Sequence, residues 1–308
     1  MTPCYRYGLL DPRPLPVAES VNAGLLGPLT LGVEVTEPRL AARCGLGNID
    51  PQHRPEGGSV AAIEAALDWP LPPPPACLVT IRRDADAFGA MAVFSLRAAG
   101  IPIGPAMRAR IDLIGRADRF DHGAWPGRRG LPERAGDIEE AGVGTQGLGA
   151  LIGGLVDPAF TAGDAAAAAC AWIGSGHVPA AWSARAMQAA GTLFTAYRNG
   201  RIRLTELDPG RIALVEGCIP GSLRLGYRLA PVVVALDETP RGAPLIPWRR
   251  ITVAQWQVGH VDLIRAASVL AAREPGWGGA PAIIGSPQGL PCRTAIRDVL
   301  AVLRDCGA

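Results

Sequence analysis

The chain has 308 residues, with 30 Lys and Arg, 28 Asp and Glu, and a formal net charge of +2. This length is enough for two domains with separate cores. The near-neutral charge argues against a nucleic-acid coat or an acidic tail, and leaves room only for a short, local basic groove.

Seven cysteines are scattered along the chain without a CxxC pair, and several lie inside apolar runs. This pattern is typical of reduced core residues and disfavours a zinc site built on cysteine. The sequence has no apolar run of about 18 residues, so no membrane span is expected. The start, MTPCYRYGLLDPRPLP, lacks the basic segment and apolar core of a secretory signal. We therefore expect a cytoplasmic protein.

The first part of the chain predicts an α/β domain. Residues 1–28, rich in proline and glycine, are expected to wrap the surface or enter a sheet edge, and residues 29–36 (LTLGVEVT) alternate as a strand does. Residues 43–58 (RCGLGNIDPQHRPEGG) form a long polar loop of a kind that is often functional. Residues 60–67 predict a helix with Ser59 as its N-cap.

The most informative stretch is 77–97, CLVTIRRDADAFGAMAVFSLR. Its β-branched, apolar start predicts a buried parallel strand, and its later apolar spacing predicts a helix. Asp84 and Asp86 lie at the turn between them, where ligands collect in open α/β sheets and where two carboxylates can converge on a hard cation. The alternative is that Asp86 caps the helix and Asp84 is a solvated strand end.

The rest of the chain predicts helices and then a β-rich region. The helical patterns cover residues 144–155, 165–173 and 180–197. After residue 200 the chain predicts strands at 202–204, 212–215, 223–227, 232–236 and 282–284, and helices at 261–273 and 294–303. We therefore expect an α/β fold with three parts: a parallel-sheet domain with helices on both faces (1–160), a helical linker (161–200) and a smaller mixed α/β domain (201–308).

Two stretches resemble the DHH-type phosphoesterases. The run Asp84-Ala-Asp86-Ala-Phe-Gly89-Ala90 resembles the family's metal-binding turn, with Ala90 in place of a small hydroxyl residue. The run from Trp277 to Gly285 keeps the spacing of the family's glycine-rich substrate segment, although its histidine position is occupied by Ala280. The resemblance implies a metal-binding first domain and a substrate-binding second domain.

Other positions depart from the family pattern. Thr80 stands where the family usually has a histidine, and no Asp-His-His triplet follows the turn. Asp118 resembles the isolated aspartate of the family's second motif. Asp50 and His53, in the preceding loop, are inferred to fill the positions left open, and an ordinary surface histidine is the alternative for His53. The inferred ligands of one or two Mn²⁺ or Mg²⁺ ions are Asp50, His53, Asp84, Asp86 and Asp118.

Residues in both parts of the chain are candidates for substrate binding. Arg82 and Arg83 point to opposite faces if they continue a strand, so at most one reaches the site, and Arg82 is the candidate. In the second domain, the expected substrate-binding residues are Gly278, Gly279, Gly285 and Ser286, because small residues let the backbone approach an anion closely. Arg293 is expected to face the same anion. A plain turn is the alternative for the two glycines. Trp248, Trp256 and Trp277 are either base-stacking or core residues.

These expectations describe an enzyme in which a metal-activated water attacks the phosphorus of a small phosphoester. Asp84, Asp86 and His53 are its expected catalytic residues, and a short oligonucleotide or a nucleotide-like metabolite is the expected substrate. Long nucleic acid and membranes are not expected partners, and a homodimer is compatible with the sequence. Two alternatives remain open: a metal-dependent enzyme that acts on a non-phosphate substrate in bacterial specialised metabolism, and a non-catalytic nucleotide-binding module.

Overall fold

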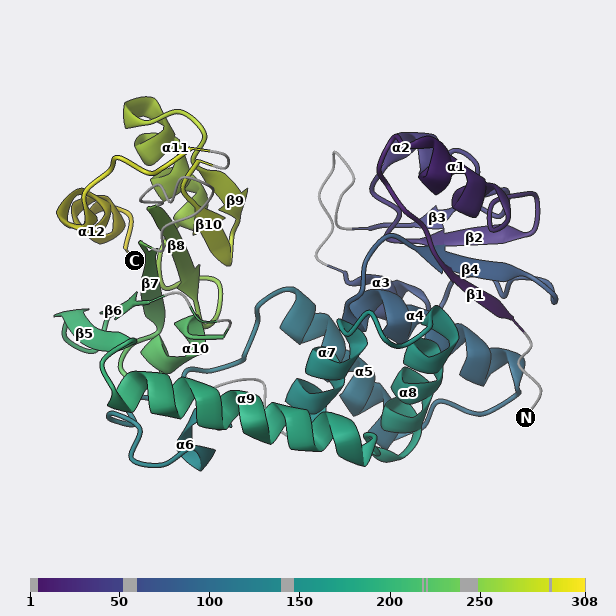
Figure 1. The fold of residues 1–308 in the computed structure, drawn as a ribbon, viewed down its shortest axis with the longest axis horizontal. Coiled ribbons are helices and arrows are strands. Elements are labelled where there is room, and N and C mark those ends of the chain that lie inside the picture. The colour runs from purple at the N-terminus through teal and green to yellow at the C-terminus, as the bar shows by residue number, and fades with distance from the viewer. Residues whose placement is uncertain are drawn as a thin grey trace. The chain divides into compact units, whose positions relative to one another are not determined.

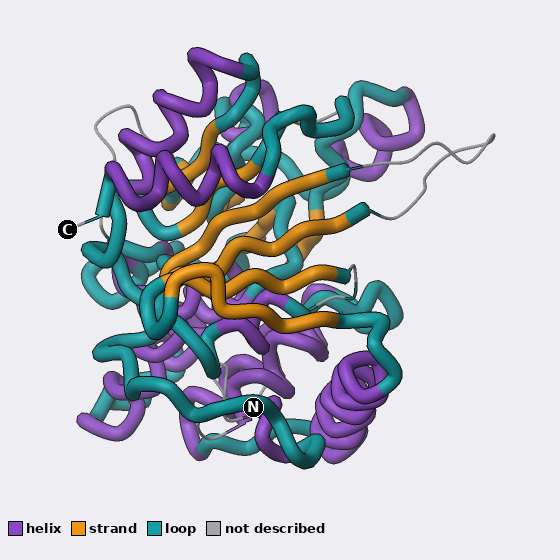
Figure 2. Tube along the Cα trace, turned by 90° about the vertical axis from the view of Figure 1, so that its left-hand side faces the viewer, coloured by secondary structure: helices purple, strands orange, loops and turns teal. Residues whose placement is uncertain are grey.

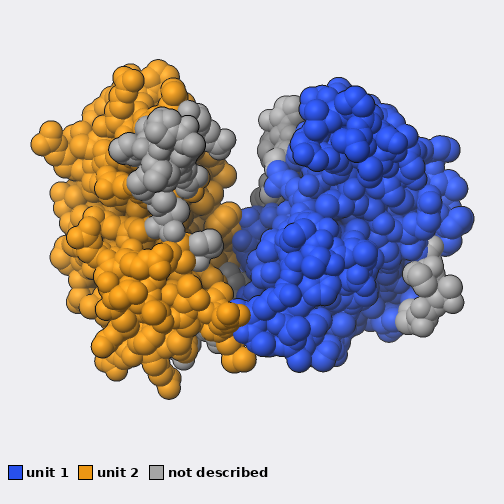
Figure 3. Space-filling view, viewed as in Figure 1, with its two compact units in different colours: residues 1–119, 145–186 blue, residues 120–144, 187–308 orange. Residues whose placement is uncertain are grey.

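The computed structural model describes residues 5–51, 60–139, 147–217, 219, 221–238, 249–287 and 290–307. The chain divides into two compact units, one made of residues 1–119 and 145–186 and the other of residues 120–144 and 187–308 (Figure 3). Each unit has its own β-sheet with helices packed on it, which confirms the expected two-domain α/β fold.

The first unit contains a sheet of four parallel strands in the order β1-β4-β2-β3. Its elements are β1 (Arg6–Leu9), α1 (Pro16–Ala23), β2 (Thr30–Val33), α2 (Pro38–Ala41), β3 (Asn48–Ile49), α3 (Ala62–Ala65), β4 (Cys77–Thr80), α4 (Ala85–Ala98), α5 (Pro105–Asp118), α7 (Leu148–Leu155) and α8 (Ala162–Ser175).

Every residue of the central strands β2 and β4 is buried, because helices cover both faces of this sheet (Figure 1). The helices α1 and α2 lie on one face, and α4 and α8 on the other. Since all four strands are parallel, their carboxyl ends meet at one edge. Residues that follow β2, β3 and β4 are therefore brought together although they are far apart in sequence.

The expected helical linker over residues 161–200 is divided between the two units. Helix α8 packs along α4, where the Cys170 thiol lies 3.5 Å from the carbonyl oxygen of Ala92, so α8 belongs to the first unit. The boundary falls inside α9 (Ala180–Arg198). Residues 120–144 belong to the second unit, where the Arg228 guanidinium donates to the carbonyls of Gly130 and Asp137.

The second unit has a mixed sheet of six strands in the order β5-β6-β7-β8-β10-β9 (Figure 2). Besides the second part of α9, its elements are α6 (Gly136–Glu139), β5 (Arg203–Asp208), β6 (Ile212–Glu216), α10 (Leu223–Gly226), β7 (Val232–Asp237), β8 (Arg250–Gln255), α11 (Leu263–Arg273), β9 (Gly278–Ala280), β10 (Ile283–Gly285) and α12 (Ile296–Asp305). Only β6 and β7 pair in parallel.

Alternation along β7 gives this sheet two apolar faces. Val232 and Val234 pack in a core with residues of α11 and α12, whereas Val233 packs with Leu193 of α9 and Leu225 of α10. Successive side chains of a strand point to opposite faces, so one strand contributes to both cores.

Several predicted elements differ from the structure. Residues 223–227, predicted as a strand, contain helix α10, because Leu225 and Tyr227 are buried in the core shared with α9. An apolar run this short does not distinguish helix from strand by its period. The structure also adds β8 and β9, which the sequence did not predict, and places β1 and α1 in the amino-terminal segment.

Candidate functional site

Acidic residues gather at the carboxyl edge of the parallel sheet in the first unit. Glu34 directly follows β2, Asp50 directly follows β3, and Asp84 and Asp86 lie where the chain leaves β4 and enters α4. Asp118 is the last residue of α5. The edge of one sheet thus combines carboxylates from four segments.

The electrostatics show that four of these groups lie close to one another. Burial and the charges of Asp86, Asp84 and Asp118 raise the pKa of Glu34 to about 9, and only Arg82 acts in the opposite direction. Burial and Asp118 are the main causes that raise the pKa of Asp86 to about 7. Carboxylates crowded in this way are stabilised by a cation.

Asp84 is the N-cap of α4. Its backbone is extended, and its Oδ1 accepts a hydrogen bond of 2.9 Å from the N–H of Ala87. Sequence analysis offered the N-cap role as an alternative for Asp86, and the structure gives it to Asp84. An aspartate here satisfies an N–H that the helix itself cannot pair.

Asp86 is buried and connects α4 to α3. Its Oδ2 and Oδ1 accept hydrogen bonds of 2.8 Å from the backbone N–H groups of Ala62 and Ile63, in the first turn of α3. The N-cap position of α3 is Ala61, which has no side-chain acceptor, so Asp86 supplies the missing cap from another helix. A side chain on Gly89 would collide with Ile63, so this glycine allows the two helices to approach.

Of the residues that precede Asp84, Arg82 lies near the acidic residues, whereas Arg83 and Thr80 make structural hydrogen bonds. The Arg83 guanidinium donates to the carbonyls of Asp157 and Phe160, at distances of 3.1 and 3.0 Å, so it holds the connection between α7 and α8. Arg82 lies near enough to lower the pKa of Glu34. Thr80, in the place of the family histidine, is fully buried, and its hydroxyl accepts from the N–H of Arg82 at 3.0 Å.

The loop that was expected to supply two ligands is described only in part. Asp50 is 9% exposed, whereas His53 lies outside the described residues. Asn48 has a clear structural role: its Oδ1 accepts from the N–H of Val35 and its Nδ2 donates to the Val35 carbonyl, at 3.2 and 3.1 Å. It thereby fixes the backbone directly after Glu34.

Glu34 was missed by sequence analysis. It sits in the alternating run LTLGVEVT, where a polar residue is expected on the exposed face of a strand. The available signal was its position: β2 ends at Val33, so an acidic residue directly follows a strand of a parallel sheet.

Within the part of the chain that the structure describes, no group of three or more His, Cys, Asp or Glu side chains is arranged as a metal site.

The glycine-rich candidate segment belongs to the edge of the second sheet. Gly278 and Gly279 are in the edge strand β9, and Gly285 ends β10. The Ser286 hydroxyl is buried and accepts a hydrogen bond from the N–H of Ile251 at 3.0 Å. This contact joins the end of β10 to β8. Arg293 is exposed and precedes α12, and its N–H donates to Glu274 Oε1 at 2.7 Å.

The two glycines of β9 can be tested separately. Gly279 has a φ of +149°, and a Cβ there would overlap the carbonyl oxygen of Ile283, whereas a Cβ on Gly278 would meet nothing within 4 Å. We expect Gly279→Ala to lower the free energy of unfolding by about 2 kcal/mol and Gly278→Ala to leave it unchanged, measured by thermal unfolding. An equal loss in both variants would contradict this assignment of Gly279 to hairpin geometry.

Three tryptophans are candidates for base stacking. Trp277 is buried in the core under α11 and α12, and Trp256 is buried with Tyr227, at a ring-centroid distance of 5.3 Å. Both therefore fit the packing alternative. Trp248 lies outside the described residues.

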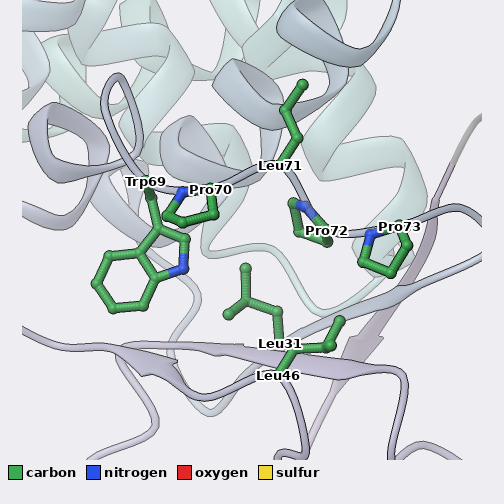
Figure 4. A pocket seen from close by; sticks show the side chains of 7 residues that line it. All are labelled: Leu31, Leu46, Trp69, Pro70, Leu71, Pro72 and Pro73. Carbon is green, nitrogen blue, oxygen red and sulfur yellow. The ribbon is translucent and has the colours of Figure 1, made fainter.

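The first unit also has an apolar pocket, lined by Leu31, Leu46 and the segment from Trp69 to Pro73 (Figure 4). The side chains drawn there carry no acidic or basic group. The pocket therefore offers no charged side chain to a cation or a phosphate, and the acidic edge is the better candidate for chemistry.

No family model matches this chain, and a search of curated proteins finds no match. The resemblance to the DHH-type phosphoesterases therefore stays a prediction. None of the helices among the described residues is long and apolar enough to cross a membrane.

Proposed function

We propose that this protein is a divalent-cation-dependent hydrolase of a small phosphoester, such as a short oligonucleotide or a nucleotide-like metabolite. The observation that supports the proposal is the gathering of Glu34, Asp84, Asp86 and Asp118 at the carboxyl edge of a parallel sheet, close enough to raise the pKa of two of them. The resemblance of residues 84–90 to a metal-binding turn supports the same assignment.

The chemistry of these side chains fits Mg²⁺ or Mn²⁺. All the described candidates are carboxylates, and hard oxygen ligands are those that these ions prefer. Asp50, Asp84, Asp86 and Asp118 are the proposed ligands, with His53 joining from the loop. Asp86 can serve although it accepts two hydrogen bonds, because a carboxylate has about four lone-pair sites.

A phosphate group requires a cation at this edge. The amino-terminal end of α4 offers N–H groups, but Asp84 and Asp86 place negative charge in the same turn. A divalent ion would offset that charge, make water more acidic and stabilise the charge that develops on phosphate oxygens. In the proposal, Arg82 binds a substrate oxygen, while Asp84 keeps the first turn of α4 in place.

The proposed substrate is small and the proposed location is the cytoplasm. A net charge of +2 gives little long-range attraction for a polyanion, which favours a short oligonucleotide or a metabolite over long nucleic acid. Five cysteines of the described part are free thiols, and four of them are buried, as expected in a reducing compartment.

The decisive variant is Asp84→Asn. Asparagine is as good an N-cap as aspartate, so the helix should start normally while the charge is lost. We expect Mn²⁺ affinity, measured by isothermal titration calorimetry, to fall at least about tenfold, and hydrolysis of bis(p-nitrophenyl) phosphate at least about 100-fold. Asp112→Asn, on the exposed side of α5, is the matched control and should change neither.

Three outcomes separate the proposal from its alternatives. A wild-type protein that binds no divalent ion would exclude the cation site. Ion binding without hydrolysis of any phosphate ester would favour chemistry on another substrate. Full hydrolysis by Asp84→Asn would show that this edge is not the catalytic site.

A further inference from the structure

Glu34 has an unusual backbone for its residue type. Its φ is +52°, and among the described residues only Phe120 shares a positive φ without being glycine. A glutamate in the left-handed region is strained, and such strain persists only where the surrounding structure enforces it.

The surrounding structure enforces this conformation from both sides. The Glu34 N–H donates to the carbonyl of Ile49 at 2.8 Å, which continues the pairing of β2 with β3. The Asn48 side chain makes two hydrogen bonds to the next residue, Val35. These contacts turn the chain at the end of β2 and direct the Glu34 side chain into the protein, where it is 1% exposed.

The side chain ends beside the acidic edge without a partner for one of its oxygens. Among the described residues, none forms a hydrogen bond with Glu34 Oε2, which is fully buried. The groups whose charges it experiences are three acids, Asp86, Asp84 and Asp118, and one cation, Arg82. A buried carboxyl oxygen without a partner is unfavourable in itself, and coordination to a cation would satisfy it.

We infer that Glu34 is a further, direct ligand of the divalent cation at this edge. The inference rests on the proposed cation site and adds to it the one acidic side chain that reaches the site from β2. A cation there would give Glu34 Oε2 a partner and offset the charges of the neighbouring aspartates. The strained turn then has a purpose, since it aims a carboxylate into the site instead of into solvent.

The test measures Mn²⁺ binding by isothermal titration calorimetry on the full chain. Glu34→Gln keeps the shape of the side chain and removes its charge, and Glu34→Gly removes the ligand while suiting the positive φ. We expect both variants to bind Mn²⁺ at least tenfold more weakly than the wild type. Glu19→Gln, an exposed partner of Arg43 in the same unit, should bind like the wild type. Circular dichroism checks that each variant is folded.

The outcomes distinguish this inference from the proposed function. If Asp84→Asn loses Mn²⁺ affinity while both Glu34 variants bind like the wild type, the role of Glu34 is excluded and the cation site stands. If the wild type itself binds no Mn²⁺, both are excluded. A tenfold loss in either folded Glu34 variant, with the Glu19 control unchanged, supports the inference.

Discussion

Replacement of Asp86 by alanine is expected to lower the free energy of unfolding by about 3 kcal/mol. The variant removes the acceptor of two 2.8 Å hydrogen bonds, which the backbone N–H groups of Ala62 and Ile63 donate. Both residues are fully buried, so both N–H groups lose their partner. A buried donor left without an acceptor costs about 1–3 kcal/mol. Thermal or urea unfolding near pH 6, followed by circular dichroism, measures the change.

The matched comparison is Asp84→Ala. Asp84 accepts one hydrogen bond as the N-cap of α4, and loss of such a cap costs about 1 kcal/mol. The two aspartates, two residues apart and alike in the sequence pattern, should therefore differ clearly in their effect on stability. Similar losses for both would contradict the role of Asp86 as the cap of α3.

Without added metal, the stability of the protein is expected to decrease as the pH rises from about 5 to 9. The pKa of Glu34 is raised from 4.5 to about 9 by burial and by three neighbouring aspartates, so in this range the folded chain holds a proton that the unfolded chain has lost. The stability is therefore greatest at a pH below 4.5, the pKa of Glu34 in the unfolded chain, and it is lost as the pH rises toward about 9, the pKa of Glu34 in the folded chain. Each pKa unit corresponds to about 1.4 kcal/mol, which makes the loss on the order of 5 kcal/mol.

Glu34→Gln isolates this contribution. Asp86 also contributes, but its pKa is raised only to about 7, so its contribution ends near neutral pH. Between pH 7 and 9 the unfolding temperature of the wild type should continue to fall, whereas that of Glu34→Gln should level off. Glu19→Gln should follow the wild type, and a slope that is the same in all three proteins would contradict a raised pKa of Glu34.

The local sequence determined the central segment of the proposed site, in which strand β4 is followed by helix α4. The β-branched run that begins at Cys77 forms β4, and the apolar spacing after Asp86 forms α4, because strand and helix periods are encoded in neighbouring residues. The later helices α9, α11 and α12 were predictable for the same reason. Asp84 and Asp86 were recognised as notable because they lie where a parallel strand meets a helix.

The tertiary structure decided what each acidic residue contacts. Asp86 caps a helix that begins 24 residues earlier, and this depends on the packing of α3 on α4. Glu34 joins the acidic edge because β2 lies beside β4 in the sheet, a pairing between segments more than 40 residues apart. Periodicity describes a segment and its faces, whereas hydrogen bonds and charges between distant segments are set only when the sheet order brings the strand ends together.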